Sequence, residues 1–221
     1  TFYNEESIEL LSKLNIWSDL KKSDYTHVKK IQVFGKKNAT PLIWDNSNKD
    51  KNFGAIVKNK VMLNSIFSKL SDIKKYENLV TNTTCDNFER TLYLNDKHYV
   101  KTNLVLCADG KNSQLRKLLL IKTILKKTGH IAISGFLEQS KDHEFTATQA
   151  FTKLGPIGLL PFENKNKINF VLSVEETIYK NISSKNNPEQ YICEKLENFF
   201  SNLNLSFKPI KKINNLKNNL S

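Results

Sequence analysis

The sequence has few glycines, and none of its cysteines or histidines is spaced to hold a metal. Seven of the 221 residues are glycine, and none of them clusters as in a GxGxxG phosphate-binding loop. Cys85, Cys107 and Cys193 lie far apart, which predicts free thiols in a reducing compartment and no metal site. The four histidines form no metal-binding pattern, and we interpret them as surface or incidental residues. The apolar runs, such as residues 61–67, are too short to cross a bilayer.

Arginine is also scarce, although the chain is strongly basic. The net charge is +12, and Arg90 and Arg116 are the only arginines, so lysine carries nearly all of the positive charge. A basic chain can be a nucleic-acid-binding module, but such proteins favour the bidentate guanidinium of arginine and cluster their charges. Here the lysines are scattered and asparagine is abundant, which is typical of AT-rich codons. We expect no nucleic-acid partner, and the basic binding module stays as the alternative from another functional class.

The first half of the chain alternates between helical and strand patterns. Residues 4–20 and 59–70 carry apolar side chains at helical spacing, and Asn4 is suited to cap the first of these helices. Residues 28–34 alternate as in a strand, and a turn-rich stretch follows. These patterns predict an α/β domain with a strand-rich insertion near residues 28–57.

The pattern changes near residue 125. A helix is predicted from Pro188 to residue 201, and it is preceded by four strand-like runs: HIAISGFLEQ, EFTATQAFTKL, GPIGLLPF and KINFVLSV. Runs of strands with little helix between them indicate an antiparallel sheet. The sequence thus predicts two domains, an α/β domain over residues 1–125 and a mainly antiparallel α+β domain over residues 126–221.

The segment LVLCADGKNSQLR (104–116) predicts a strand, a tight turn and a helix. The apolar run 103–109 is typical of a strand buried on both faces, as in a parallel sheet. Such a strand would bring Asp109 to the carboxyl edge of the sheet, where ligands of open α/β sheets bind. Gly110 permits a sharp turn, and Arg116 is placed to bind a phosphate or to hold Asp109. An ordinary strand, turn and helix with an Asp at the turn fits this spacing equally well.

The same segment resembles the DGxxSxxR flavin motif of the class A FAD-dependent monooxygenases. The match covers Asp109, Gly110, Ser113 and Arg116. The resemblance implies the FAD- and NAD(P)-binding fold of the p-hydroxybenzoate hydroxylase type. It places these four residues near the ribityl and pyrophosphate groups of FAD and near the path of NAD(P)H. An arginine at this position, in a chain that uses lysine at nearly every other basic position, agrees with a need for a planar guanidinium.

Two further segments are similar to the ubiquinone-biosynthesis hydroxylases within that class. NEESIELLSKLNIWSDLKK (4–22) is similar to their early LLxxLGLW helix. IVKNKVMLNSIFSKL (56–70) is similar to their ENRxxxxxLLxxL segment, whose start lies against the flavin. Asn59 matches this pattern and Lys60 replaces its arginine, so the resemblance implies cofactor contacts at both. Leu63 replaces a glutamine that is common there.

A third segment, TQAFTKLGPIGLLPFENKNKINFVLSVEE (148–176), is similar to the FTxxGPxAxLPL segment of the same enzymes. The resemblance implies that GPIGLLP forms part of the wall between flavin and substrate. Leu159 and Leu160 suit a ring that carries a polyprenyl chain. An ordinary core strand with turn residues at its ends is the alternative. The expected substrate wall consists of Gly155, Pro156, Leu159, Leu160 and Pro161.

The resemblance implies a function for a longer protein, of which this chain is expected to be an internal fragment. That function is FAD-dependent hydroxylation of the aromatic ring of a polyprenylated ubiquinone precursor, with NAD(P)H and O2. The GxGxxG turn and the Gly-Asp motif of the family's flavin site do not occur, so we expect residues 1–221 to be inactive alone. Another FAD-dependent oxidoreductase, such as a different aromatic hydroxylase or a prenyl reductase, is the alternative. The expected location is cytoplasmic, with peripheral association at the inner membrane or in a biosynthetic complex.

Overall fold

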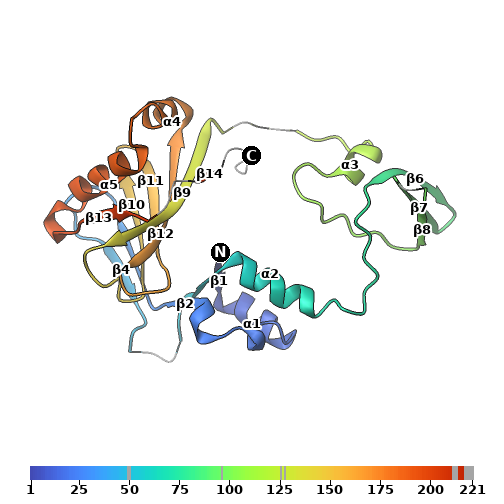
Figure 1. Cartoon of the computed structure of the whole chain (residues 1–221), viewed down its shortest axis with the longest axis horizontal. Coiled ribbons are helices and arrows are strands. Elements are labelled where there is room, and N and C mark those ends of the chain that lie inside the picture. Colours follow the sequence, from blue (N-terminus) through green and yellow to red (C-terminus); the bar gives the residue numbers. More distant parts are fainter. Residues whose placement is uncertain (49–50, 96, 125, 127, 211–213, 217–221) are drawn as a thin grey trace. The chain divides into compact units, whose positions relative to one another are not determined.

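The computed structural model describes residues 1–221 except 49–50, 96, 125, 127, 211–213 and 217–221 (Figure 1). The chain divides into two compact units, and the first combines Thr1–Ser71 with Lys127–Ser221. The second unit is Asp72–Lys126. The first unit therefore draws on both sides of the boundary expected at residue 125. The division into an α/β domain over residues 1–125 and a mainly antiparallel domain over residues 126–221 stays a prediction.

A large sheet dominates the first unit, and its centre confirms the antiparallel sheet predicted over residues 130–174. The neighbouring strands run antiparallel in the order β9-β12-β11-β10. Their bounds are β9 (His130–Gln139), β10 (Thr146–Thr152), β11 (Gly155–Pro161) and β12 (Lys167–Glu175). Apolar residues alternate along each run, so each strand buries every second side chain on one face of the sheet.

Both edges of this sheet are extended by segments far away in the sequence. At one edge β3 (Lys30–Phe34) pairs parallel with β10, and β4 (Leu42–Asp45) pairs antiparallel with β3. At the other edge β13 (Phe207–Pro209) and β14 (Asn214–Leu216) both pair with β9. The predicted strand 28–34 is in fact two strands, because the chain leaves one sheet at Val28 and enters this one at Lys30.

A small sheet and two helices make up the rest of the N-terminal part of the first unit. The sheet has the order β1-β5-β2, with β1 (Phe2–Asn4), β2 (Tyr25–Val28) and β5 (Gly54–Val57). Helix α1 (Glu5–Lys13) is capped by Asn4 as predicted, and α2 (Asn59–Ser68) agrees with the predicted helix 59–70. Helix α1 is shorter than predicted because Asn15 takes a positive φ of 54°, which turns the chain before Trp17.

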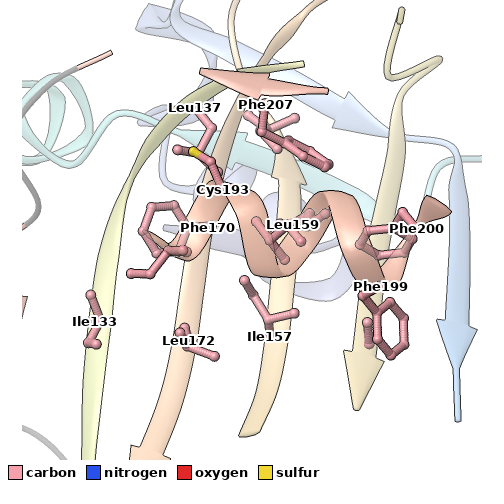
Figure 2. Packing of buried hydrophobic residues seen from close by; sticks show 14 of the residues in the cluster. Ile133, Leu137, Ile157, Leu159, Phe170, Leu172, Cys193, Phe199, Phe200 and Phe207 are labelled. Carbon is pink, nitrogen blue, oxygen red and sulfur yellow. The ribbon is translucent and has the colours of Figure 1, made fainter. Parts of the chain in front are cut away.

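Helices α4 (Glu176–Ser183) and α5 (Pro188–Phe199) cover one face of the large sheet (Figure 1). Helix α5 was predicted, and α4 was not. On α5 the buried residues Ile192, Leu196 and Phe199 recur at helical spacing and belong to one core cluster with residues of the strands. Side chains from both layers form the main core: Ile133, Leu137, Ile157, Leu159, Phe170, Leu172, Cys193, Phe199, Phe200 and Phe207 (Figure 2). We call this the covered face.

The second face of the large sheet is covered at one end only. Near Leu160 it packs against Val28 of β2, Ile56 of β5 and Phe162. At the other end Phe151 and Val171 are 50% and 36% exposed. The second face thus combines a packed end with an exposed apolar end. Its residues on the three central strands are Ala147, Gln149, Phe151, Pro156, Gly158, Leu160, Asn169 and Val171.

The second unit contains a three-stranded antiparallel sheet and a short helix. The sheet has the order β6-β7-β8, with β6 (Val80–Asp86), β7 (Glu89–Leu94) and β8 (Tyr99–Thr102). Strands β7 and β8 form an antiparallel hairpin, and residue 96 between them lies outside the described residues. Strand β6 was not predicted, because VTNTTCD lacks an apolar alternation. Among the described residues, no helix combines the length and the apolar character needed to cross a bilayer.

The predicted buried strand 103–109 is wrong. Residues 104–110 have no strand structure, and Leu104 and Leu106 are 72% and 83% exposed. A strand exists only where a neighbour accepts and donates its backbone hydrogen bonds, and none of the described strands pairs with this run. The apolar composition is typical of a strand, but composition alone does not show whether a neighbouring strand is there to pair with it.

One histidine and one cysteine are buried. Of the two alternatives for the histidines, a surface position is wrong for His143, which is 6% exposed and accepts a hydrogen bond from the amide of Phe145 at 3.1 Å. Cys85 and Cys107 are exposed free thiols, whereas Cys193 lies in the main core. Burial raises the pKa of the Cys193 thiol to about 11, and the charge of Glu197 adds to this effect. Cys193 is therefore a structural residue.

Two glycines on opposite faces of the sheet provide a matched test of this architecture. A Cβ at Gly135, on the covered face, would lie 2.8 Å from Cε1 of Phe170, whereas a Cβ at Gly158, on the second face, would meet nothing within 4 Å. We expect Gly135→Ala to lower the free energy of unfolding by about 1–3 kcal/mol through overpacking. Gly158→Ala should leave it within about 0.5 kcal/mol of the parent. Urea denaturation of both variants measures this difference, and equal losses would show that the two faces are wrongly assigned.

Candidate functional site

The Asp-Gly turn of the second unit is held together by the Asp109 carboxylate. Its Oδ2 accepts hydrogen bonds from the amides of Gln114 at 2.8 Å and Leu115 at 3.4 Å. Its Oδ1 accepts one from the Cys107 thiol at 3.0 Å. The hydrogen bonds from Cys107 and Ser113, and then those from the two amides, hold the pKa of Asp109 well below its usual range. Asp109 is therefore a carboxylate that closes the turn onto the start of helix α3 (Gln114–Leu118).

Ser113 and Arg116 complete the turn. Ser113 is buried and caps α3, because its hydroxyl accepts a hydrogen bond from the amide of Arg116 at 3.0 Å. The guanidinium of Arg116 donates to the backbone carbonyl of Lys111. Arg116 thus fixes the loop between Gly110 and the helix through the backbone. The structure brings all four residues of the predicted flavin motif into one turn.

Cys107 is a contact residue that the sequence patterns did not indicate. Its sulfur lies 3.0 Å from Oδ1 of Asp109 and 3.1 Å from Oγ of Ser113. Cys107 precedes Asp109 by two residues, and this spacing predicts a contact between their side chains only if the fold of the turn is already known. Because Cys107 is exposed, its contacts restrict the Asp109 carboxylate without removing it from solvent.

Asn59 and Lys60 lie in the first unit, at the first two positions of α2. Both side chains are exposed, and Asn59 Oδ1 accepts a hydrogen bond from the hydroxyl of Thr1. Lys58, directly before them, forms an ion pair with Glu163 at 2.8 Å. The predicted cofactor residues therefore fall into two groups, one in each unit, and their roles stay predictions.

The five residues of the predicted substrate wall all lie on β11, but they divide between the two faces of the sheet. Leu159 pairs with Phe170, is 5% exposed and points into the main core beneath α5 (Figure 2). Leu160 pairs with Asn169 on the second face, as expected from alternation along a strand. Pro156 lies on the same face as Leu160 and is exposed. Leu159 is therefore a core residue, as the alternative interpretation of this segment had it.

Gly155 and Pro161 mark the two ends of β11. Gly155 has a φ of 136°, and a Cβ there would lie 2.0 Å from the carbonyl oxygen of Ser173. Only glycine allows this close approach of two backbones at the turn into β11. Pro161 pairs with Ile168 and is buried at the other end of the strand. Both residues therefore have structural reasons to be present, and Gly155 cannot be replaced without strain.

Solved structures with a similar fold include proteins that are bound to FAD or described as FAD-dependent. PqsL of Pseudomonas aeruginosa, bound to 2-aminobenzoylacetate, superposes with a TM-score of 0.72 at 14% identity, over 95% of this chain and 62% of PqsL. HpxO of Klebsiella pneumoniae, bound to FAD, has a TM-score of 0.62 at 14% identity, over 92% and 57% of the two chains. A salicylate hydroxylase has a TM-score of 0.63 at 14% identity, over 80% and 48%.

Sequence similarity leads to a narrower group. The chain is 25% identical over 169 residues to the mitochondrial ubiquinone biosynthesis monooxygenase COQ6 of Caenorhabditis elegans, which is 72% of this chain and 37% of that protein. It is 24% identical over 172 residues to the Drosophila melanogaster protein of the same name, or 73% and 36%. This chain thus spans less than half the length of the curated relatives that it matches. No family model matches it.

The fold is that of solved flavin enzymes such as PqsL, whose structure is described as that of a probable FAD-dependent monooxygenase. The sequence is similar to that of ubiquinone biosynthesis monooxygenases. Both statements confirm the resemblance found in the motifs. The α/β fold with a mainly antiparallel second sheet is confirmed as well.

The Asp-Gly turn fits FAD as a secondary contact. A Cβ at Gly110 would meet nothing within 4 Å, and its φ is 76°, so the backbone of the turn is open to a ligand. An ionised carboxylate such as Asp109 has further lone pairs on Oδ1 for a ligand hydroxyl. No described group of three or more His, Cys, Asp or Glu side chains is arranged to hold a metal. A contact of Asp109 and Gly110 with the cofactor stays a prediction.

Removing the Asp109 charge tests its role in the turn. Asp109→Asn should loosen the first turn of α3, because the amides of Gln114 and Leu115 lose a charged acceptor. The amide proton shifts of these two residues, followed by NMR, measure the change. Asp86→Asn, at the end of β6 in the same unit, is the control and should leave them in place.

Acidification should have the same effect as the substitution. A carboxyl whose pKa is lowered on folding stabilises the fold at pH values above its unfolded pKa, about 3.9, and this stabilisation is lost as pH falls toward the folded value. The two amide shifts of the unsubstituted chain should therefore stay constant through about pH 4 and move only at pH values well below the usual carboxyl range, where Asp109 of the folded chain takes up a proton. They should stay constant in Asp109→Asn over the same range. Identical pH profiles for the two proteins would contradict the assignment of Asp109 as the closing residue.

Proposed function

We propose that this chain is part of an FAD-dependent monooxygenase that hydroxylates the aromatic ring of a polyprenylated ubiquinone precursor with NAD(P)H and O2. The observation that carries the proposal is the similarity to COQ6 along 72% of this chain. The exposed apolar end of the second face, with Phe151, Pro156 and Val171, supports it. An apolar surface is what a ring with a polyprenyl tail requires of a binding site.

Each group of residues has a separate task in this proposal. The second face at Pro156, Gly158 and Leu160 orients the ring and excludes water from it. Asp109 accepts a hydrogen bond from a hydroxyl of the cofactor. Arg116 stabilises the turn by donating a hydrogen bond to the Lys111 carbonyl. Bound FAD supplies the oxygen-activating chemistry once NAD(P)H has reduced it. Asn59 and Lys60 contact the flavin from the start of α2.

The partners and location follow from the substrate class. A polyprenylated ring is dissolved in a membrane, so we propose peripheral association with an inner membrane or with other enzymes of the same biosynthetic complex. The relatives in worm and fly carry the word mitochondrial in their names. Residues 1–221 contain no GxGxxG turn, so we propose that they do not retain FAD when purified alone.

Deletion of the gene that encodes this chain tests the function. We expect the deletion strain to accumulate a polyprenylated phenol that lacks one oxygen atom of the finished quinone, because ring hydroxylation is the missing step. Mass spectrometry of lipid extracts identifies this compound. A plasmid with the unchanged gene should restore the quinone.

Two other outcomes would contradict the proposal. Unchanged quinone with no new phenol would exclude a hydroxylase in this pathway. Accumulation of a lipid that differs from a cellular product by two hydrogen atoms, in its prenyl chain, would indicate a prenyl reductase instead.

A further inference from the structure

Glu163, in the turn between β11 and β12, contacts three separate segments of the first unit. Its backbone amide donates to the hydroxyl of Thr26 on β2 at 2.9 Å, and Thr26 is buried. Its carboxylate pairs with Lys58, which precedes α2, at 2.8 Å. It also accepts a hydrogen bond from Lys167 at the start of β12. The residue therefore joins the small sheet, the start of α2 and the hairpin of the large sheet.

Aromatic rings shield these charges from water on one side. The Lys167 ammonium lies 5.6 Å from the ring centre of Phe136 and 5.4 Å from that of Phe162, and the two rings lie 4.8 Å apart. The side chains of Glu163 and Lys167 are each only 27% exposed. The lysines Lys167 and Lys58 hold the pKa of Glu163 below its usual range. A partly buried pair in a network is stronger than an isolated surface pair.

The position of this network in the chain gives it a further consequence. Lys58 is the N-cap of α2, and its side chain makes no capping hydrogen bond there. Its carbonyl accepts the amides of Val61 and Met62 at 3.1 Å, which begin the helix. Asn59 and Lys60 are the next two residues. On the other side, Glu163 follows the end of β11 by only two residues.

We propose that Glu163 is a positioning residue that fixes the start of α2, with Asn59 and Lys60, against the end of β11. The inference rests on the proposed function for the meaning of these two elements, the cofactor side and the substrate side of the site. The hydrogen bond from the Glu163 amide to Thr26 fixes the position of Glu163. The ion pair of its carboxylate with Lys58 then fixes the position of the start of α2. The distance between cofactor and ring would then depend on this ion pair.

Hydrogen exchange of residues 1–221, analysed by mass spectrometry of short peptides, tests the proposal without any cofactor. Glu163→Gln keeps the shape and the Thr26 hydrogen bond and removes only the charge. We expect the amides of Val61 and Met62 to exchange about fivefold faster, since the start of α2 is released. Strand amides at Phe170 and Leu172 should keep their rates. Glu176→Gln is the matched control, because the Glu176–Lys180 pair is exposed and spans 3.9 Å.

Variants of Lys58 separate positioning from a general structural role. Lys58→Met should reproduce the faster exchange, and the double variant with Glu163→Gln should add nothing further, as expected for one shared interaction. Lys58→Arg keeps the charge and should restore protection. A general role would instead speed exchange in all elements together, or give additive effects, and either result would overturn the proposal.

Failure of this inference and failure of the proposed function are distinguishable. Exchange of the α2 amides does not depend on flavin or substrate, so unchanged rates in Glu163→Gln disprove positioning whatever the deletion strain shows. If the strain makes normal quinone while the exchange effects hold, Glu163 still positions α2, and the proposed hydroxylation is wrong.

Discussion

The packing of helix α5 on one face of the large sheet is the contact on which the other features depend. Ile192, Leu196 and Phe199 fill the covered face, and this burial decides which side chains of each strand point inward. Burying one such side chain contributes about 1.5–3 kcal/mol. A shift of β11 by one residue would bring Leu160 to the core and Leu159 to the second face, so the register is strongly determined. The position of α5 therefore decides which residues of GPIGLLP point away from the core.

The small sheet then divides the second face into a packed and an exposed end. Val28 and Ile56 cover the sheet beside Leu160, and they leave Phe151 and Val171 accessible. Gly158, with open space at its missing Cβ, lies between these ends. The end of the face with Phe151 and Val171 is therefore apolar and accessible, and the other end is bounded by the segments that lead into α2. These are the properties that a ring-binding surface next to a cofactor helix needs.

The sequence predicted most of the local structure and less of the long-range pairing. Strands β9 to β12 follow from alternation, and α5 follows from Pro188 and its apolar stripe. Helix α4 was not predicted because it directly follows strand β12, and strand β6 was not predicted because its residues are mostly polar. The parallel pairing of β3 with β10 joins residues more than 110 positions apart, which no local pattern reports. Residues 103–109 have the composition of a strand, but a strand also needs a pairing partner, which composition does not reveal. The contact of Cys107 with Asp109 depends on the folded turn and has no sequence pattern of its own.

Thiol labelling on β11 tests the central claim, that the second face and not the covered face receives the ring. In a chain whose exposed Cys85 and Cys107 are replaced by serine, Gly158→Cys and Leu159→Cys place a thiol on one face or the other of the same strand. The account predicts rapid maleimide labelling of the Gly158→Cys variant, slowed by an excess of a polyprenylated phenol. It predicts slow labelling of the Leu159→Cys variant with or without that phenol. Equal labelling rates in the two variants, or protection by the phenol of the Leu159→Cys thiol instead, would contradict it.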